Sequence, residues 1–433
     1  MDSPAARLEV DPLLDDPRTR IVVCCGSGGV GKTTTAAALG VRAAERGRKA
    51  VVLTIDPARR LAQSMGISEL DNVPRRVKGV DESAGGELHA MMLDMKRTFD
   101  EIVEAHADGE RARAILENPF YQSLSAGFAG TQEYMAMEKL GQLRTRDAWD
   151  LIIVDTPPSR SALDFLDAPK RLGSFLDGKF IRVLMAPAKA GGRAGMKFLN
   201  VGMSMMTGTL SKIMGGQLLR DVQTFAAAMD TMFGGFRTRA DATYRLLQAP
   251  GTAFLVVAAP ERDALREAAY FVERLAAEQM PLAGLVLNRV HGSGAAQLSA
   301  ERALAAAEAL SEPSDARSEN LGGDGIVDLE AGKADSRTAD GPSPAAADPS
   351  TTDDSPSAAR LAAGLLRLHA ERMHVLARER RTRDRFTALH PEVPVAEIAA
   401  LPGDVHDLAG LRAIGERLAV QERGVEKSED GEG

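Results

Sequence analysis

A glycine-rich run directly after a short apolar segment constrains this chain more than any other feature. Residues 26–34 read GSGGVGKTT, and residues 21–25 before them read IVVCC. A glycine separated by four residues from Gly-Lys-Thr is the pattern of a phosphate-binding loop, which requires a buried strand before it and a helix after it. Residues 33–46, rich in alanine, are typical of that helix. We therefore expect this loop to hold the phosphates of a nucleotide.

The residues of this loop predict ATP and Mg²⁺ as its ligands. Glycines let backbone N–H groups curl around phosphate oxygens, and the start of the helix adds the positive end of its dipole. Lys32 is expected to reach the β- and γ-phosphates and to act in catalysis, while the Thr33 hydroxyl is expected to bind Mg²⁺. The predicted ATP-binding residues of the loop are Gly26, Ser27, Gly28, Gly29, Val30, Gly31, Lys32, Thr33 and Thr34.

Two aspartates that follow apolar segments extend the predicted site. Asp155 comes directly after LIIV at residues 151–154, a position from which a carboxylate binds Mg²⁺ through water. Asp56 directly follows the segment AVVLTI at residues 50–55 and is expected to orient the water that attacks the γ-phosphate. Aspartate at the end of a strand is also a common turn or helix-capping residue, so each role depends on the neighbouring phosphate loop.

Strand-like and helix-like segments alternate along the chain, which indicates βαβ units. The predicted fold is α/β, a P-loop NTPase with a mostly parallel twisted sheet flanked by helices and an inserted helical subdomain. That subdomain is expected at residues 96–146 and 164–248. The strands are expected at residues 21–25, 50–55, 151–154, 254–258 and 282–288, with a short one at 393–395.

Composition divides the chain into further parts. Residues 311–357 hold eleven acidic and three basic residues, and their net charge of −8 equals that of the whole chain. Such a segment buries too little apolar surface to fold alone. The expected order is a flexible N-terminus (1–19), the ATPase domain (20–291), a largely disordered acidic insertion (292–357), the completion of the domain (358–421) and a flexible tail (422–433).

Charge, cysteine content and hydropathy exclude several classes of protein. The net charge of −8 argues against a nucleic-acid partner. The basic region at residues 377–386 is interrupted by acidic residues and is interpreted as a solvated face. Cys24 and Cys25 are adjacent in a strand and point to opposite faces, so we expect buried core side chains rather than a metal or disulfide site. The absence of long apolar runs and of a secretory signal favours a cytoplasmic location, and any contact with a membrane surface would be transient because no segment is expected to span it.

The phosphate loop, DPA at residues 56–58 and DTPP at residues 155–158 resemble one known family. This is the deviant P-loop ATPase family that drives arsenite pumps and delivers tail-anchored membrane proteins. The resemblance covers most of residues 20–290 and 390–420, and GTQE at 130–133 is similar to a weakened form of the family's Pro-Gly-x-Asp-Glu block. It implies that Asn288 reads the adenine and that Pro402, in the loop LPGD, closes over the base.

The resemblance also implies how such a protein works. Two subunits face each other across the nucleotides, and ATP closes the dimer. Asp56 would position water in the first switch, and Asp155 would sense the γ-phosphate through the second. The implied function is a Mg·ATP-dependent dimeric ATPase that couples nucleotide binding and hydrolysis to capture or targeting of a membrane-protein client or membrane partner. The Met-rich segment at residues 196–232 is interpreted either as a groove for an apolar client or as ordinary core or dimer packing.

Three departures from the family pattern leave alternatives open. Ser27 stands where the family has a lysine that reaches the partner's phosphates, so Arg59, Arg60 or Arg160, or a lysine from a paralogous partner, would have to supply that charge. A Cys-x-x-Cys pair is absent, so no structural zinc is expected, and the arsenite-binding cysteines have no counterpart. The alternatives are a regulatory nucleotide-binding subunit of a heterodimer, or a positioning ATPase of the partition or septum type.

Overall fold

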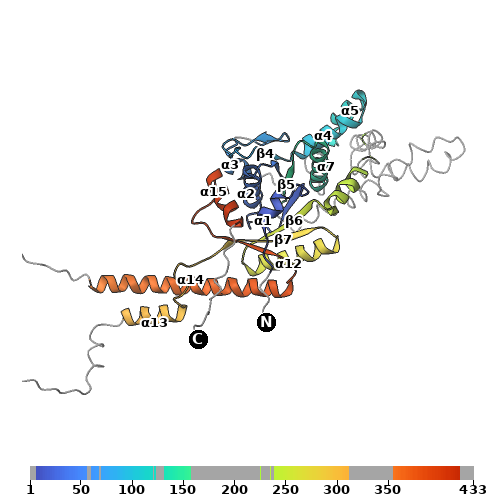
Figure 1. Cartoon of the computed structure of the whole chain (residues 1–433). Coiled ribbons are helices and arrows are strands. Elements are labelled where there is room, and N and C mark those ends of the chain that lie inside the picture. The colour runs from blue at the N-terminus through green and yellow to red at the C-terminus, as the bar shows by residue number, and fades with distance from the viewer. Residues whose placement is uncertain are drawn as a thin grey trace, which may run out of the picture. The chain divides into compact units, whose positions relative to one another are not determined.

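The computed structural model describes residues 6–55, 60–67, 70–119, 121–122, 131–157, 225, 235, 238–311 and 355–419. The chain divides into two compact units. One unit joins Met1–Val290 with Thr382–Gly433, and the other is His291–Arg381. Figure 1 labels helices of both units and several strands of the first unit.

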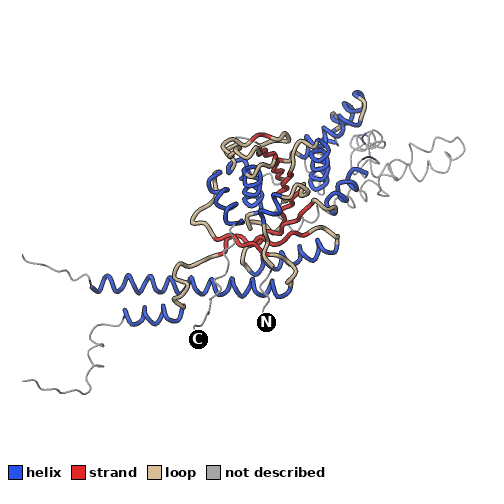
Figure 2. Tube along the Cα trace, viewed as in Figure 1, coloured by secondary structure: helices blue, strands red, loops and turns tan. Residues whose placement is uncertain are grey.

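The first unit is built on a single sheet, drawn in red in Figure 2. In the described part of the chain the strand order is β3-β4-β2-β5-β1-β6-β7-β8, and only the β3–β4 pair is antiparallel. This arrangement confirms the predicted α/β fold. The strands are β1 (Ile21–Cys25), β2 (Lys49–Thr54), β3 (Arg75–Arg76), β4 (Glu87–Met92), β5 (Leu151–Asp155), β6 (Thr252–Ala258), β7 (Leu282–Val290) and β8 (Val395–Ala399).

Helices cover both faces of this sheet, and each face has its own hydrophobic core. Helices on one face are α1 (Val10–Asp15), α2 (Lys32–Glu45), α3 (Arg60–Ser64) and α15 (Leu408–Ala419). Helices mainly on the other face are α4 (Met95–His106), α5 (Gly109–Leu116), α7 (Thr131–Arg146) and α12 (Arg262–Ala277).

The two cysteines show how the central strand serves both cores. Cys25 belongs to the core with α4, α7 and α12, whereas Cys24 belongs to the core with α2 and α15. Both thiols are buried and free, which confirms the predicted placement on opposite faces. Desolvation by burial raises the pKa of Cys25 to about 12 and raises the pKa of Cys24 well above its usual value.

We therefore expect neither thiol of the native protein to react with a maleimide at pH 8. The thiolate is the reactive form, and a raised pKa removes it at that pH. In denaturant both thiols should regain an ordinary pKa of about 8.5 and react within minutes. Mass spectrometry of the labelled protein counts the modified thiols, and rapid native labelling of either cysteine would contradict this account of the central strand.

The prediction of a flexible N-terminus is wrong for residues 6–19. These residues form α1 and its flanks, where Val10 and Leu14 are buried. Asp11 accepts hydrogen bonds from Arg42 of α2, which holds the pKa of that carboxyl below its usual value. The apolar residues four apart in this acidic segment place one face of a short helix against the core.

The region between β2 and β5 also differs from expectation. β3 and β4 were not predicted, and the described part of the expected helical stretch at residues 96–146 includes the separate helices α4, α5 and α7. Of the second expected helical stretch, residues 238–248 are helical. The Met-rich segment at residues 196–232 lies outside the described residues apart from residue 225.

The second unit contains α13 (Ala300–Ser311) and most of α14 (Ser355–Leu389). His369 of α14 lies 2.8 Å from the Leu298 carbonyl oxygen, and Arg367 donates to the Ser311 hydroxyl at 3.0 Å. The second contact joins the two helices, and the first joins α14 to the segment before α13. None of the helices described for this chain is long and apolar enough to cross a membrane.

Candidate functional site

The phosphate loop joins β1 to α2 through glycines that other residues could not replace. Gly26 has φ +148°, and a Cβ there would lie 2.1 Å from the Val257 carbonyl oxygen. Gly31 has φ +98°, and its Cβ would lie 2.2 Å from the Asn288 side-chain nitrogen. Gly29 has φ +77° with nothing within 4 Å of the same position. The loop thus combines positive-φ backbone with close packing at Gly26 and Gly31 and open space at Gly29, which fits the cradle that backbone N–H groups make for phosphate oxygens.

The N-terminus of α2 has the features of an anion-binding helix start. Its N-cap residue, Gly31, has no side chain that could cap the helix, and no acidic residue lies in its first turn. The first N–H groups of a helix have no partner within it, and its N-terminus carries positive partial charge. An anionic group facing the loop would satisfy both conditions.

Lys32 is held directly over the loop. Its side chain is buried, and Nζ donates to the Ser27 carbonyl oxygen at 2.8 Å. Burial of an ammonium group disfavours its charge unless anionic or polar groups surround it. A phosphate bound at the loop would provide that anion within reach of the same nitrogen.

Asp155 is the centre of a buried polar cluster beneath the loop. It is fully buried at the end of β5. One carboxylate oxygen accepts hydrogen bonds from the Thr33 hydroxyl at 2.7 Å and from the Thr54 hydroxyl at 2.8 Å. The register explains this meeting, because Asp155 lies beside Cys24 of β1 and Thr54 of β2. The predicted partners Thr33 and Asp155 therefore lie together.

This cluster fits a magnesium ion by its chemistry. Hydroxyl and carboxylate oxygens are the ligands that Mg²⁺ prefers, and it is bound by one or two such groups together with substrate phosphates. Thr33 and Asp155 would hold the ion beside the loop. A bound Mg²⁺ would neutralise negative charge on the phosphates of ATP.

Sequence reasoning missed Thr54. The signal was available, since Thr54 is a hydroxyl residue at the end of an apolar strand, two positions before Asp56. Asp56 itself lies outside the described residues, as do Arg59, Arg160 and the side chain of Arg60.

The backbone around Asp56 is nevertheless tied to the site and to α7. The Ile55 N–H donates to the Asp155 carbonyl oxygen at 3.0 Å. The Ile55 carbonyl oxygen accepts a hydrogen bond from Gln132 Nε2 of α7 at 2.9 Å. Gln132 belongs to the block at residues 130–133, so this block touches the residue directly before the predicted water-orienting aspartate.

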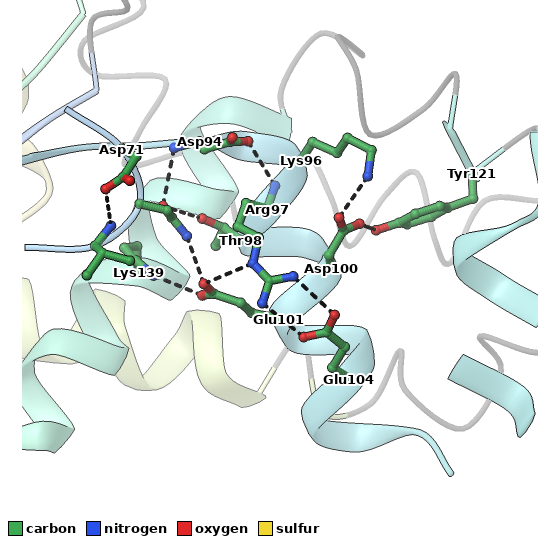
Figure 3. Close-up of polar contacts among 12 residues, drawn as sticks. Asp71, Asp94, Lys96, Arg97, Thr98, Asp100, Glu101, Glu104, Tyr121 and Lys139 are labelled. Carbon is green, nitrogen blue, oxygen red and sulfur yellow. Dashed lines mark hydrogen bonds and ion pairs between the residues drawn. The ribbon is translucent and has the colours of Figure 1, made fainter. Parts of the chain in front are cut away.

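Helix α7 is in turn fixed to its neighbours by buried charges. Lys139, which is buried, donates to Glu101 of α4 at 2.9 Å, as Figure 3 shows. Glu138, also buried, accepts hydrogen bonds from Arg239 in the helix at residues 238–248. Charges paired in this way resist separation, because breaking one pair leaves an uncompensated buried charge.

Asn288 lies on the phosphate loop. Its Nδ2 donates to the Val30 carbonyl oxygen at 2.8 Å, and its Oδ1 accepts from the Arg289 N–H at 2.9 Å. The β7–β8 pairing is irregular between Leu287 and Val290, and Arg289 has φ +63°. Such an irregularity re-aims a side chain next to an active site, which here places the Asn288 amide against the loop.

Pro402 is exposed in the loop after β8. β8 runs parallel to β7, and β7 to β6 and β6 to β1, so this loop leaves the sheet at the edge that carries the phosphate loop. Ligands of open α/β sheets bind at this carboxyl edge.

Comparison with known proteins decides the family. Residues 19–304 match the family model described as anion-transporting ATPase. The chain belongs to this family. It is 26% identical over 308 residues to ATPase GET3 of Podospora anserina, covering 70% of this chain and 83% of that protein. It is 23% identical to ATPase ASNA1 homolog 2 of Paramecium tetraurelia, covering 64% and 78%. A protein of Halobacterium salinarum named as an arsenical pump-driving ATPase is 31% identical over 202 residues, 44% of this chain and 29% of that protein.

The family match confirms the resemblance that the motifs indicated. As an anion-transporting ATPase family member, the chain is a nucleotide-binding ATP hydrolase of the P-loop type. The matched residues include the phosphate loop, Asp155 and Asn288. They end at residue 304, so α14 lies beyond the match.

Proposed function

We propose that this ATPase is Mg²⁺-dependent and dimeric, and couples ATP binding and hydrolysis to capture or targeting of a membrane-protein client or membrane partner. The observation that carries the nucleotide chemistry is the buried Asp155 carboxylate, joined to the Thr33 hydroxyl directly below the phosphate loop. The site of action is the cytoplasm, and the ATPase domain consists of residues 20–291 completed by 358–421.

Each predicted site residue has a distinct role in this proposal. Thr33 and Asp155 hold Mg²⁺, and Lys32 binds the β- and γ-phosphates. Asp56 orients the attacking water, while Asn288 and Pro402 contact the adenine.

Coupling to a client requires a mechanical link from the nucleotide to the helical layer. The hydrogen bond from Gln132 to the Ile55 carbonyl oxygen supports such a link, because it joins α7 to the residue before Asp56. The ion pairs of Lys139 and Glu138 carry any movement of α7 to α4 and to residues 238–248. ATP can shift this arrangement only as far as it binds one state better than the other.

Replacing Asn288 by alanine is expected to reduce discrimination between ATP and GTP by about tenfold. An asparagine amide that hydrogen-bonds the base rejects the wrong pattern of donors and acceptors, and its loss removes that penalty. Competition binding with both nucleotides measures the effect. Gln279→Ala, at a site remote from the loop, is the control, and unchanged discrimination in Asn288→Ala would remove the adenine role.

Ser27 favours a second candidate function, the regulatory half of a heterodimer. Its carbonyl oxygen accepts from Lys32, but its short side chain cannot reach a partner's phosphates. In this arrangement a paralogous partner supplies the missing lysine and hydrolyses ATP.

The rate of ATP turnover by the purified chain at increasing concentration distinguishes the two functions. A homodimer predicts a specific rate that rises with concentration as chains associate. A rate that stays negligible until a paralogue is added would favour the heterodimer. A brisk, concentration-independent rate from a chain that is monomeric by its mass in solution would contradict both, because each requires a second subunit.

A further inference from the structure

Helix α14 presents a row of apolar side chains to solvent within the second unit. Leu361 is 68% exposed, Leu365 60%, Leu368 63% and Val375 42%. At about 100° per residue these four positions fall within an arc of about 80°. They form one stripe along the helix, which we call the leucine row.

The leucine row is not the face on which α14 packs in its unit. Ala363 and Ala370, about 180° from Leu361 around the helix, are almost completely buried. Exposed large apolar side chains gathered in one row indicate a surface that contacts another apolar phase.

A basic row runs beside the leucine row. Arg360, Arg367, His374 and Arg381 follow each other at intervals of seven residues, and all are exposed. Measured from Leu361 around the helix, Arg360 and Arg367 lie at about 100° and 120°, on the flank of the leucine row. His374 and Arg381 lie at about 140° and 160°, farther from that row. Residues 355–389 hold eight arginines and three acidic residues, a net charge of +5 in a chain of net charge −8.

We propose that α14 lies on an anionic lipid surface. The leucine row would enter the boundary between headgroups and acyl chains, and Arg360 and Arg367 of the basic row would contact the anionic headgroups. Helices that lie in the plane of a membrane combine these features, with leucines on one face and arginines beside them. Basic side chains near such a surface add electrostatic attraction that salt weakens.

A second copy of the chain fits this face less well. Along the same line of the helix come Arg372, which donates to the Gly292 carbonyl oxygen at 2.9 Å, and Glu379, whose carboxylate lies 2.5 Å from His291 Nδ1. The uninterrupted apolar stretch is therefore shorter than the three to four heptads typical of a coiled coil.

Co-flotation of the full chain with vesicles tests this proposal. Neutral phosphatidylcholine vesicles are compared with vesicles that also contain phosphatidylserine. We expect binding to the anionic vesicles only, reduced by 0.5 M salt. The triple variant Leu361→Gln, Leu365→Gln, Leu368→Gln should bind at least tenfold less, and so should Arg360→Gln with Arg367→Gln. Val73→Gln, at a residue 60% exposed in the first unit, is the control and should bind normally.

ATP turnover and circular dichroism establish that each variant is folded, since none of these residues belongs to the nucleotide site. No binding by the wild type, equal binding to neutral vesicles, or full binding by the triple variant would overturn the proposal. A lower oligomeric mass of the triple variant in the absence of vesicles would also overturn it, in favour of a second copy on the leucine row.

Discussion

Replacing Lys32 by alanine is expected to weaken ATP binding strongly and to lower turnover at least about 100-fold, the scale on which enzymes lose rate when one charge-stabilising donor is removed. Lys32 is the buried cation of the loop, held 2.8 Å from the Ser27 carbonyl oxygen. Alanine removes the charge that would meet the β- and γ-phosphates. Equilibrium binding of ATP and steady-state phosphate release measure the two effects.

Lys96→Ala is the matched control for this variant. Lys96 is half-exposed on α4 and pairs with Asp100 at 2.7 Å. Surface pairs of this kind contribute about 0–1 kcal/mol to stability, so binding and turnover should stay at the wild-type level. If Lys32→Ala retained turnover within threefold of the wild type, the phosphate loop would not be the catalytic site.

Replacing Asp155 by asparagine is expected to lower turnover by about 100- to 1000-fold, again by the loss of preorganised charge at the reacting phosphates. The variant keeps the shape of the side chain but loses the negative charge that would hold Mg²⁺. It also replaces one acceptor oxygen with an amide donor, in a cluster where the Thr33 and Thr54 hydroxyls both donate to one oxygen. Turnover measured against Mg²⁺ concentration shows whether the remaining activity needs more metal.

The control for Asp155→Asn lies at the other end of the same strand. Asp150, directly before β5, accepts a hydrogen bond from the Lys49 N–H at 3.0 Å. Asp150→Asn removes a charge of the same kind far from the loop, so the Mg²⁺ dependence of turnover should not change. An equal loss in both variants would show that Asp155 acts on the stability of the sheet and not on the metal.

The central strands could be predicted because they are buried on both faces. β1, β2, β5, β6 and β7 appear in the sequence as continuous apolar runs, which is typical of a parallel sheet. β4 was missed because its sequence, ELHAMM, mixes polar and apolar residues. α1 was missed because its buried residues are few and stand among acidic ones. Each of the two segments is stabilised by an element that is distant in the sequence. β4 pairs with β2, and α1 packs in the core that contains α2.

The site residues that belong to recognisable sequence motifs could be predicted. Lys32, Thr33 and Asp155 stand in patterns whose chemistry is known, and the structure brings Thr33 and Asp155 together. Thr54 and Gln132 could not be assigned in the same way, because their contacts depend on strand register and on the position of α7. The placement of Asn288 on the loop depends likewise on the irregular β7–β8 pairing.

Equilibrium binding of ATP to the purified chain, with and without Mg²⁺, tests the central claim most directly. Calorimetric titration should show one ATP per chain, bound more tightly with Mg²⁺ than in its absence, and this difference should disappear in Asp155→Asn. A wild-type chain that is folded and binds no ATP in either condition would contradict the assignment of residues 26–34 and Asp155 as a nucleotide site.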